Sequence, residues 1–331
     1  MTLILSDADV RAAVDMATLV DAIERATKEE GRGQVVQPER MNLPNGEGVF
    51  RVMPVVLSES GVMGFKVFHG SPRGSWRYLV AVYDAHEGSL LALMDAHFLT
   101  ALRTGAATGV ATRLLARQKA HRVGVIGSGL EARTNLEAVC VVRPVDRVRV
   151  FSPNAQKRQR FAAEMAERLQ VEIEAVDSPE EAVGGTDIVV VATNTTGHEA
   201  HIAYRGSWIE PGQHVNAIGS TMLGLREIDE ETFRRVDLLV TDAPAEQIER
   251  ESGDVAAALA ANTYDRSRVV RLCELLTGQA EGRARDDQMT LYKSVGEALQ
   301  DVIAGYAIYQ TARARGIGTE VGDFLLPKAF G

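Results

Sequence analysis

The sequence predicts an α/β protein in which a doubly wound parallel sheet is inserted into an α+β domain. Three observations favour this fold class. Strand and helix patterns alternate from residue 121 onward, short β-branched segments fill residues 48–94, and an Ala-rich helical stretch occupies residues 294–315. A chain of 331 residues has the length of about two domains.

Residues 6–30 are predicted to be helical. Ser6 has the side chain of an N-cap, and the second of two helices is expected to stop at Gly31. Three residues of that second helix fall on one face: Val20, Ile23 and Thr27.

An antiparallel meander is predicted after these helices, because short β-branched runs are separated by Gly, Pro, Ser or Asn. Residues 85–88 (Ala-His-Glu-Gly) have the composition of a hairpin turn, and the Ala-rich residues 99–118 have strong helix propensity. The expected strands are residues 48–56, 62–68, 79–84 and 90–94.

The alternation from residue 121 onward implies right-handed βαβ crossovers and a parallel sheet. Ser178, followed by Pro179 and Glu181, has the pattern of a capping box at a helix start. The expected strands are residues 122–126, 148–151, 171–175, 188–192, 214–218 and 238–240, and the expected helices include 130–142 and 155–169. The predicted domains are residues 1–118 with 297–331, and the inserted residues 119–296.

Composition excludes several classes of protein. The formal net charge is −9 with no long Lys/Arg run, so nucleic-acid binding is not expected. Two cysteines give no disulfide framework, and the histidines lack metal-ligand spacing, so no metal is predicted. Residues 1–10 lack the apolar core of a signal peptide, and no apolar run reaches the roughly 20 residues of a membrane helix. We therefore expect a cytoplasmic protein without a membrane partner.

A glycine-rich loop directly follows the strand 122–126. Residues 127–132 read Gly-Ser-Gly-Leu-Glu-Ala, the pattern G-x-G-x-x-A at the start of a helix. Such a loop brings backbone N–H groups and a helix N-terminus to a pyrophosphate, whereas a bare turn without ligand is the alternative. The strand and helix around it favour dinucleotide binding. The residues expected at the phosphates are Gly127, Ser128, Gly129 and Leu130.

The residues after the second strand indicate which dinucleotide is bound. An acid that would bond the ribose of NAD is absent there. Ser152 and Asn154 could instead bond a 2′-phosphate, and Lys157 or Arg158 could neutralise it, so NADP is favoured over NAD. In the alternative interpretation, Lys157 and Arg158 are simply exposed helix residues.

Further cofactor contacts are expected at the carboxyl ends of later strands. Thr193 and Asn194 follow the fourth strand, while His69 is interpreted as a loop histidine without function. The residues expected on the nicotinamide side are Gly219, Ser220, Thr221, Lys293 and Ser294.

Five motifs in order resemble the ornithine cyclodeaminase/mu-crystallin family, which contains cyclodeaminases, archaeal-type alanine dehydrogenases and ketimine or imine reductases. They are Gly-Phe-Lys-Val (64–67), Leu-Thr-Ala-Leu-Arg-Thr (99–104), the glycine-rich loop, Val-Asn-Ala-Ile-Gly (215–219) and Lys-Ser-Val-Gly (293–296). The resemblance implies a homodimer with the active site between a substrate-binding and dimerisation domain and a Rossmann-type domain.

The resemblance also implies roles for three basic residues. Lys66 matches a lysine that contacts substrate and takes part in proton transfer, and Arg103 and Arg40 match two arginines that bind the α-carboxylate. Guanidinium groups suit this role because they bind carboxylates through two parallel hydrogen bonds. A lysine desolvated beside arginines is expected to have a depressed pKa. In the alternative interpretation, Arg103 is a surface helix residue and Lys66 a solvated strand residue.

Two positions depart from the cyclodeaminases. Arg51 stands where they have a glutamate, and it would repel the distal amine of a diamino acid such as ornithine. Thr221 stands where they have an essential aspartate. With Arg40 and Arg103, Arg51 could select a dicarboxylic substrate such as iminosuccinate; sharing the single α-carboxylate, or pairing with Glu47, is equally compatible with the sequence.

The predicted activity is an NAD(P)H-dependent reductase or dehydrogenase that interconverts a small 2-imino acid, for example a ketimine, and an L-amino acid. One alternative is an ornithine or lysine cyclodeaminase-type lyase that uses NAD catalytically. The other is a non-enzymatic, NADPH-binding, crystallin-like protein.

Overall fold

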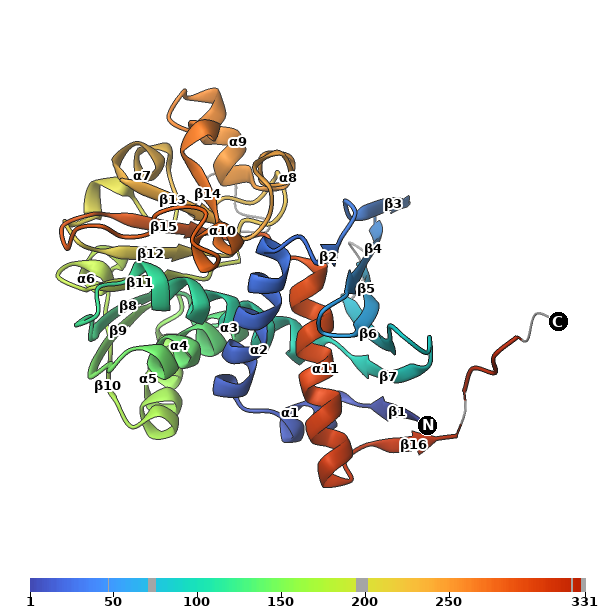
Figure 1. Cartoon of the computed structure of the whole chain (residues 1–331). Coiled ribbons are helices and arrows are strands. Elements are labelled where there is room, and N and C mark those ends of the chain that lie inside the picture. Colours follow the sequence, from blue (N-terminus) through green and yellow to red (C-terminus); the bar gives the residue numbers. More distant parts are fainter. Residues whose placement is uncertain (47, 71–75, 195–201, 323, 329–331) are drawn as a thin grey trace. The chain divides into compact units, whose positions relative to one another are not determined.

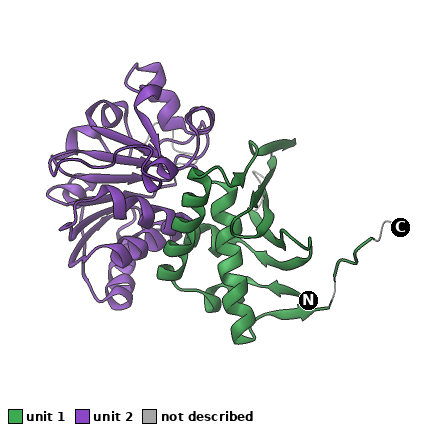
Figure 2. Ribbon diagram, in the orientation of Figure 1, with its two compact units in different colours: residues 1–103, 297–331 green, residues 104–296 purple. Residues whose placement is uncertain are grey.

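A computed structural model describes the chain except for residues 47, 71–75, 195–201, 323 and 329–331. It divides into two compact units, shown in different colours in Figure 2. Unit 1 comprises Met1–Arg103 and Glu297–Gly331, and unit 2 comprises Thr104–Gly296. The first division falls within helix α3 (His97–Leu115) rather than after residue 118, because this one continuous helix contributes to both units.

The sheet of unit 1 contains the predicted meander, in which β4 (Gly48–Leu57), β5 (Val62–Gly70), β6 (Arg77–Asp84) and β7 (Leu90–Asp95) pair antiparallel in order. The predicted turn between β6 and β7 is confirmed, since an Asp84 carboxylate oxygen accepts from the backbone N–H of both His86 and Glu87 at 2.8 Å. The outer strands were not predicted: β1 (Thr2–Leu5), β2 (Val35–Val36), β3 (Met41–Asn45) and β16 (Thr319–Val321). β1 lies between β7 and β16, so the two ends of the chain meet in one sheet.

Three helices belong to unit 1: α1 (Asp7–Ala13), α2 (Met16–Gly31) and α11 (Ala298–Arg315). Ser6 caps α1 and α2 ends at Gly31, as predicted. The predicted apolar face of α2 is buried, and α11 packs on α2 and on β5 (Figure 1). The predicted start of α11 at Ser294 is wrong, because the Ser294 hydroxyl and the next two backbone N–H groups bond the Asp242 carboxylate instead.

Unit 2 is built on an all-parallel sheet, as predicted. Its strands are β8 (Arg122–Ile126), β9 (Arg147–Phe151), β10 (Glu172–Ala175), β11 (Ile188–Val191), β12 (His214–Ala217), β13 (Leu238–Thr241), β14 (Val269–Arg271) and β15 (Thr290–Lys293). They lie in the order β10-β9-β8-β11-β12-β15-β13-β14. The strand order reverses between β8 and β11, the switch point at which doubly wound sheets bind ligands.

Seven α-helices are assigned among the described residues that lie wholly within unit 2. They are α4 (Leu130–Val142), α5 (Ala155–Leu169), α6 (Pro179–Val183), α7 (Glu230–Arg235), α8 (Ala245–Glu251), α9 (Gly253–Ala260) and α10 (Leu272–Leu276), with short 3₁₀ turns at Gly206–Trp208 and Arg266–Arg268. Ser178 caps α6 by accepting from the Glu181 N–H. The second bond of the predicted capping box differs, because the Glu181 carboxylate accepts from the Asp177 N–H instead of the Ser178 N–H.

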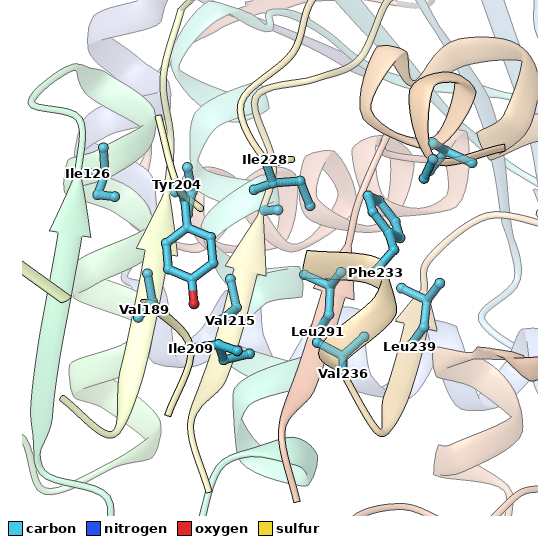
Figure 3. Close-up of a cluster of buried hydrophobic side chains, with 14 of the residues drawn as sticks. Ile126, Val189, Tyr204, Ile209, Val215, Ile228, Phe233, Val236, Leu239 and Leu291 are labelled. Carbon is cyan, nitrogen blue, oxygen red and sulfur yellow. The ribbon is translucent and has the colours of Figure 1, made fainter. Parts of the chain in front are cut away.

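The core of unit 2 includes a buried cluster that covers one face of the parallel sheet. Figure 3 shows Val189, Val215 and Leu291 on neighbouring strands, with Tyr204 and Phe233 packed against them. Near-continuous apolar runs of this kind are typical of parallel strands that are covered on both faces. The rigid sheet fixes the positions of the loops at its carboxyl edge.

Candidate functional site

The glycine-rich loop of unit 2 lies at the switch point. Gly127 has a φ of +123°, which L side chains rarely adopt, and a Cβ there would lie 2.2 Å from the Ala192 carbonyl oxygen. The Gly127 N–H donates to the Phe151 carbonyl at 2.8 Å. The loop therefore touches the ends of both β9 and β11, in a conformation that requires glycine.

The loop leads into the N-terminus of α4. Gly129 is the N-cap and supplies no side-chain acceptor to the first turn, and a Cβ at Gly129 would meet nothing within 4 Å. Leu130 begins the helix. An open N-terminus with helix N–H groups is a site that fits a pyrophosphate, which supports the predicted placement of the dinucleotide.

The residues predicted to choose between NAD and NADP separate into two groups. The Ser128 and Ser152 hydroxyl oxygens lie 2.9 Å apart, and Arg158 donates to the Ser152 carbonyl at 3.2 Å. Arg158 also pairs with the exposed Asp177 carboxylate. In contrast, the Asn154 side-chain oxygen caps α5 by accepting from the N–H of Lys157, whose side chain is exposed.

The loops after β11 and β12 are held by one carboxylate that sequence reasoning missed. Glu227 Oε2 accepts from the Thr193 N–H and hydroxyl, both at 3.1 Å, and Glu227 Oε1 accepts from the Gly219 N–H at 2.6 Å. Asn194 is exposed beside this contact, and Thr221 is half-buried. Burial raises the pKa of Glu227 to about 7.

The segment after β15 is fastened in a similar way. The Ser294 hydroxyl donates to Asp242 Oδ2 at 2.6 Å. Ser220 is fully buried, and its hydroxyl donates to the Leu225 carbonyl at 2.6 Å. Lys293 is fully buried too, with Nζ 3.4 Å from Asp254 Oδ2 and 3.2 Å from the Ala217 carbonyl. The predicted contacts of these residues with the nicotinamide ring remain predictions.

Unit 1 brings Lys66 and Arg103 together through a third residue. Lys66 Nζ and Arg103 Nε lie 2.9 Å and 3.0 Å from the same oxygen, Asp301 Oδ1. Lys66 is 2% exposed, Arg103 7% and Asp301 0%, so both alternative interpretations as solvated residues are wrong. One carboxylate oxygen is therefore shared by two cationic side chains, and the expected pKa of Lys66 stays a prediction.

Arg51 and Lys66 lie on neighbouring strands, and both of their cationic groups lie over the Phe68 ring. The Phe68 ring centre is 5.2 Å from the Arg51 guanidinium carbon and 5.6 Å from Lys66 Nζ. Arg51 Nε also donates to Asn42 Oδ1 at 2.5 Å. Arg40 is half-buried directly before β3, the strand that carries Asn42. The suggested partner Glu47 lies outside the described residues.

His69 was interpreted as a loop residue, which is wrong, because it lies within β5 and pairs with Phe50 of β4. Its Nε2 is 3.1 Å from Asn45 Nδ2 on β3. This contact connects the ring to the β3–β4 hairpin, and the absence of a catalytic role stays a prediction.

Sequence reasoning missed Asp301, its neighbour Gln300, and Glu227. Gln300 Oε1 accepts from Arg103 Nη1 at 2.8 Å, so two consecutive polar residues of α11 hold this arginine. A signal was present, since Gln300 and Asp301 interrupt the apolar residues 298–304 of a helix. Among the residues that the structure describes, no group of three or more acidic, His or Cys residues could hold a metal. Among those same described residues, every helix is too short or too polar to cross a membrane.

Comparison with known proteins identifies the family. Residues 1–316 match the model of the ornithine cyclodeaminase/mu-crystallin family. This chain belongs to that family. A Δ¹-pyrroline-2-carboxylate reductase from Bacillus cereus is 28% identical over 96% of this chain and 99% of its own length.

Two solved structures of the same fold show which cofactors relatives hold. The Δ¹-pyrroline-2-carboxylate reductase of Thermococcus litoralis, in complex with NADH and L-proline, has a TM-score of 0.89 and 35% identity, covering 96% of this chain and all of that one. An archaeal alanine dehydrogenase dimer with bound NAD has a TM-score of 0.88 and 28% identity, covering 98% and 99%. The family thus includes NAD(P)-dependent imino-acid reductases and amino-acid dehydrogenases.

Proposed function

We propose that this protein is an NAD(P)H-dependent oxidoreductase that interconverts a 2-imino acid and an L-amino acid. The observation that carries the proposal is the buried convergence of Lys66 and Arg103 on Asp301, in a chain that also has an open dinucleotide loop. Relatives that reduce a cyclic imino acid or act on alanine support the same chemistry.

In this proposal, the side chains of unit 1 bind the substrate and transfer its proton. Arg103 binds the substrate α-carboxylate, assisted by Arg40, because a guanidinium offers two parallel N–H donors. Lys66, hydrogen-bonded to Asp301, donates a proton to the substrate nitrogen during reduction and accepts it in the reverse direction. When bound, the reduced dinucleotide supplies the hydride to the imino carbon. The net reaction consumes one hydride and one proton and gives the amine.

A spectrophotometric screen of NADH and NADPH oxidation tests this function. The substrates are cyclic ketimines, 2-oxo acids with ammonia or methylamine, and a source of iminosuccinate. Oxidation that requires an imine supports the proposal. Cofactor binding without oxidation across all substrates would favour the non-enzymatic alternative.

The cyclodeaminase alternative is tested separately by incubating the protein with NAD and L-ornithine or L-lysine. Because Arg51 and Thr221 replace two acids of the cyclodeaminases, we expect neither ammonia nor proline or pipecolate to form.

NADP is the cofactor we propose, with NAD as the alternative that the two solved relatives exemplify. Ser152 with its neighbour Ser128, and Arg158 close by, offer hydroxyl and guanidinium donors to a 2′-phosphate. The test is the ratio of kcat/KM for NADPH to that for NADH. The Ser152→Asp variant, which places an acid directly after β9 as in NAD-binding folds, should shift that ratio toward NADH by roughly tenfold or more.

Arg51 is proposed to select the distal group of the substrate. Its guanidinium lies over the same Phe68 ring as Lys66 Nζ, so a second carboxylate beside the reacting nitrogen could reach it. A higher kcat/KM for iminosuccinate than for Δ¹-pyrroline-2-carboxylate would support a dicarboxylic substrate. Loss of both activities to the same extent in Arg51→Gln would instead indicate that Arg51 shares the α-carboxylate.

A homodimer is proposed from one face of the unit 1 sheet. The face opposite α11 carries apolar side chains that are only partly buried, including Phe65, Leu79, Leu91 and Leu93. Leu79 is 37% exposed, and apolar side chains that gather on one exposed sheet face are typical of an interface. A second copy is the proposed occupant, since an archaeal relative of the same fold is a dimer. Light scattering should give twice the chain mass, and Phe65→Asp should reduce the measured mass to that of one chain.

We propose, as expected from the sequence, that this enzyme works in the cytoplasm.

A further inference from the structure

Three ionisable side chains lie together inside unit 2 without contact with solvent. Glu227 is 1% exposed, and Asp254 and Lys293 are 0% exposed. Asp254 Oδ1 accepts from the backbone N–H of Glu227 at 2.8 Å and of Ile228 at 3.2 Å, while Asp254 Oδ2 lies 3.4 Å from Lys293 Nζ. Burying charges is unfavourable unless they are paired and hydrogen-bonded, and apolar residues often fill such space with equal or greater stability.

What this cluster holds is the carboxyl edge of the sheet. The Glu227 carboxylate bonds Thr193, after β11, and Gly219, after β12, so it joins two loops that the parallel strands place next to each other. A Cβ at Gly219 would lie 2.3 Å from Glu227 Oε2, and the carboxylate therefore approaches this backbone as closely as glycine allows. The two loops cannot shift independently while the three bonds persist.

These loops lie on one side of the switch point. The glycine-rich loop and Ser152 belong to β8 and β9, on the side where a doubly wound sheet holds the first nucleotide of a dinucleotide. β11, β12 and β15 form the other half, which in such sheets holds the second nucleotide. The Glu227 carboxylate therefore fastens loops of the half that, in such sheets, faces the nicotinamide nucleotide.

We propose that Glu227 is a positioning residue, whose carboxylate holds the loops after β11 and β12 in the conformation that receives the nicotinamide half of the dinucleotide. This role of Glu227 rests on the proposed function, because it requires that the protein binds NAD(P)H. Glutamine cannot replace glutamate here, because two backbone N–H groups approach opposite carboxylate oxygens. A glutamine NH₂ would face one of these donors.

The test compares two ligands on three proteins. Calorimetric titration gives Kd for the reduced cofactor and for ADP-ribose, which lacks nicotinamide, on wild type, Glu227→Gln and a control. The control is Glu230→Gln, the same substitution three residues along, where Glu230 is a partly exposed α7 residue paired with Arg226 at 2.9 Å.

The expected result is selective. Glu227→Gln should weaken binding of the reduced cofactor about tenfold, as the loss of a charge-assisted hydrogen bond implies, and change Kd for ADP-ribose less than about twofold. Glu230→Gln should change neither. Equal weakening of both ligands, or of neither, would overturn the proposal. If Glu227→Gln fails to fold, Glu227→Asp keeps the charge but is too short for both loops, and the same selectivity is expected.

A pH profile distinguishes positioning from simple packing. Burial raises the pKa of Glu227 to about 7, with Asp254 on α9 raising it and Lys293 on β15 lowering it. Bonds to the ionised carboxylate are stronger than those to the neutral acid, so Kd for the reduced cofactor should rise as pH falls from 8 to 6. The same profile should be flatter in Glu227→Gln, and an unchanged profile would contradict the proposal. Failure of the wild type to bind NADH or NADPH at any pH would overturn the proposed function itself.

Discussion

Two buried lysines, one in each unit, have opposite electrostatic surroundings. In unit 1, Lys66 and Arg103 converge on one carboxylate, Asp301. In unit 2, Lys293 lies 3.4 Å from Asp254, and both Lys293 and Asp254 act electrostatically on Glu227. Two cations around one acid favour the approach of an anion, whereas one cation among two acids is already compensated. The comparison suggests that Lys66 serves the reaction and Lys293 serves the fold.

The largest expected effect is on turnover and tests the unit 1 side of this comparison. Lys66→Ala should reduce kcat by about 10²–10⁴-fold, since it removes the proposed proton donor, while Kd for the cofactor stays unchanged. Steady-state kinetics and calorimetric titration measure the two quantities. The exposed Lys119→Ala serves as control, and undiminished reductase activity in Lys66→Ala would remove the catalytic assignment.

The second effect is on stability and tests the unit 2 side. Lys293→Met should lower the free energy of unfolding by about 3–5 kcal/mol, because it leaves buried acids without their cation. Denaturant unfolding measures the loss. Turnover per folded molecule should fall far less than in Lys66→Ala. A stable Lys293→Met enzyme without turnover would reverse the roles that we assign to the two lysines.

A smaller effect concerns geometry rather than charge. Arg103→Lys keeps a cation beside Asp301 but loses the planar pair of donors for the α-carboxylate. The KM for the imino acid should rise roughly tenfold to a hundredfold with a smaller change in kcat. Equal KM values in variant and wild type would show that the carboxylate binds elsewhere.

The smallest effects are on the pH dependence of stability, and two buried groups of unit 2 should act in opposite directions. Burial lowers the pKa of His214 to about 3 from 6.5, so its contribution is complete above pH 6.5 and is lost as pH falls toward 3. The raised pKa of Glu227 has the reverse sign, and its contribution is complete below pH 4.5 and lost as pH rises through about 7.

Thermal or denaturant unfolding of two variants separates these contributions. His214→Gln should lose less stability than wild type on acidification below pH 6.5, and Glu227→Gln less on alkalinisation from pH 5 to 8. Each slope is at most about 1.4 kcal/mol per pH unit. Parallel curves for wild type and variant would show that the group does not titrate in this range.

Local patterns were sufficient for much of the fold. The meander, the glycine-rich loop and the strands β8 to β13 were predicted because periodicity, turn composition and capping act within a few residues. β1 and β16 were missed because their pairing joins opposite ends of the chain, and β15 because a four-residue strand ending in Lys293 has no readable period.

The candidate site shows the same limit. Lys66 and Arg103 were identifiable from motifs, but Asp301 lies more than 190 residues further along the chain, and only packing of α11 on the sheet brings it to them. Lys293 was predicted to contact the cofactor, which stays a prediction, but its buried pairing with Asp254 could not be predicted, because the sequence alone does not show which distant acids lie near it.

The division of unit 1 into two segments sets an order of assembly during synthesis. The strands β4–β7 emerge early, but α11, which covers one of their faces, and β16, which pairs with β1, are made last. All of unit 2 is translated in between. Its parallel sheet can complete its strand pairing as soon as β15 is synthesised. The first segment of unit 1 (Met1–Arg103) therefore keeps apolar surface exposed until α11 has left the ribosome. During that time the growing chain is a candidate for chaperone binding.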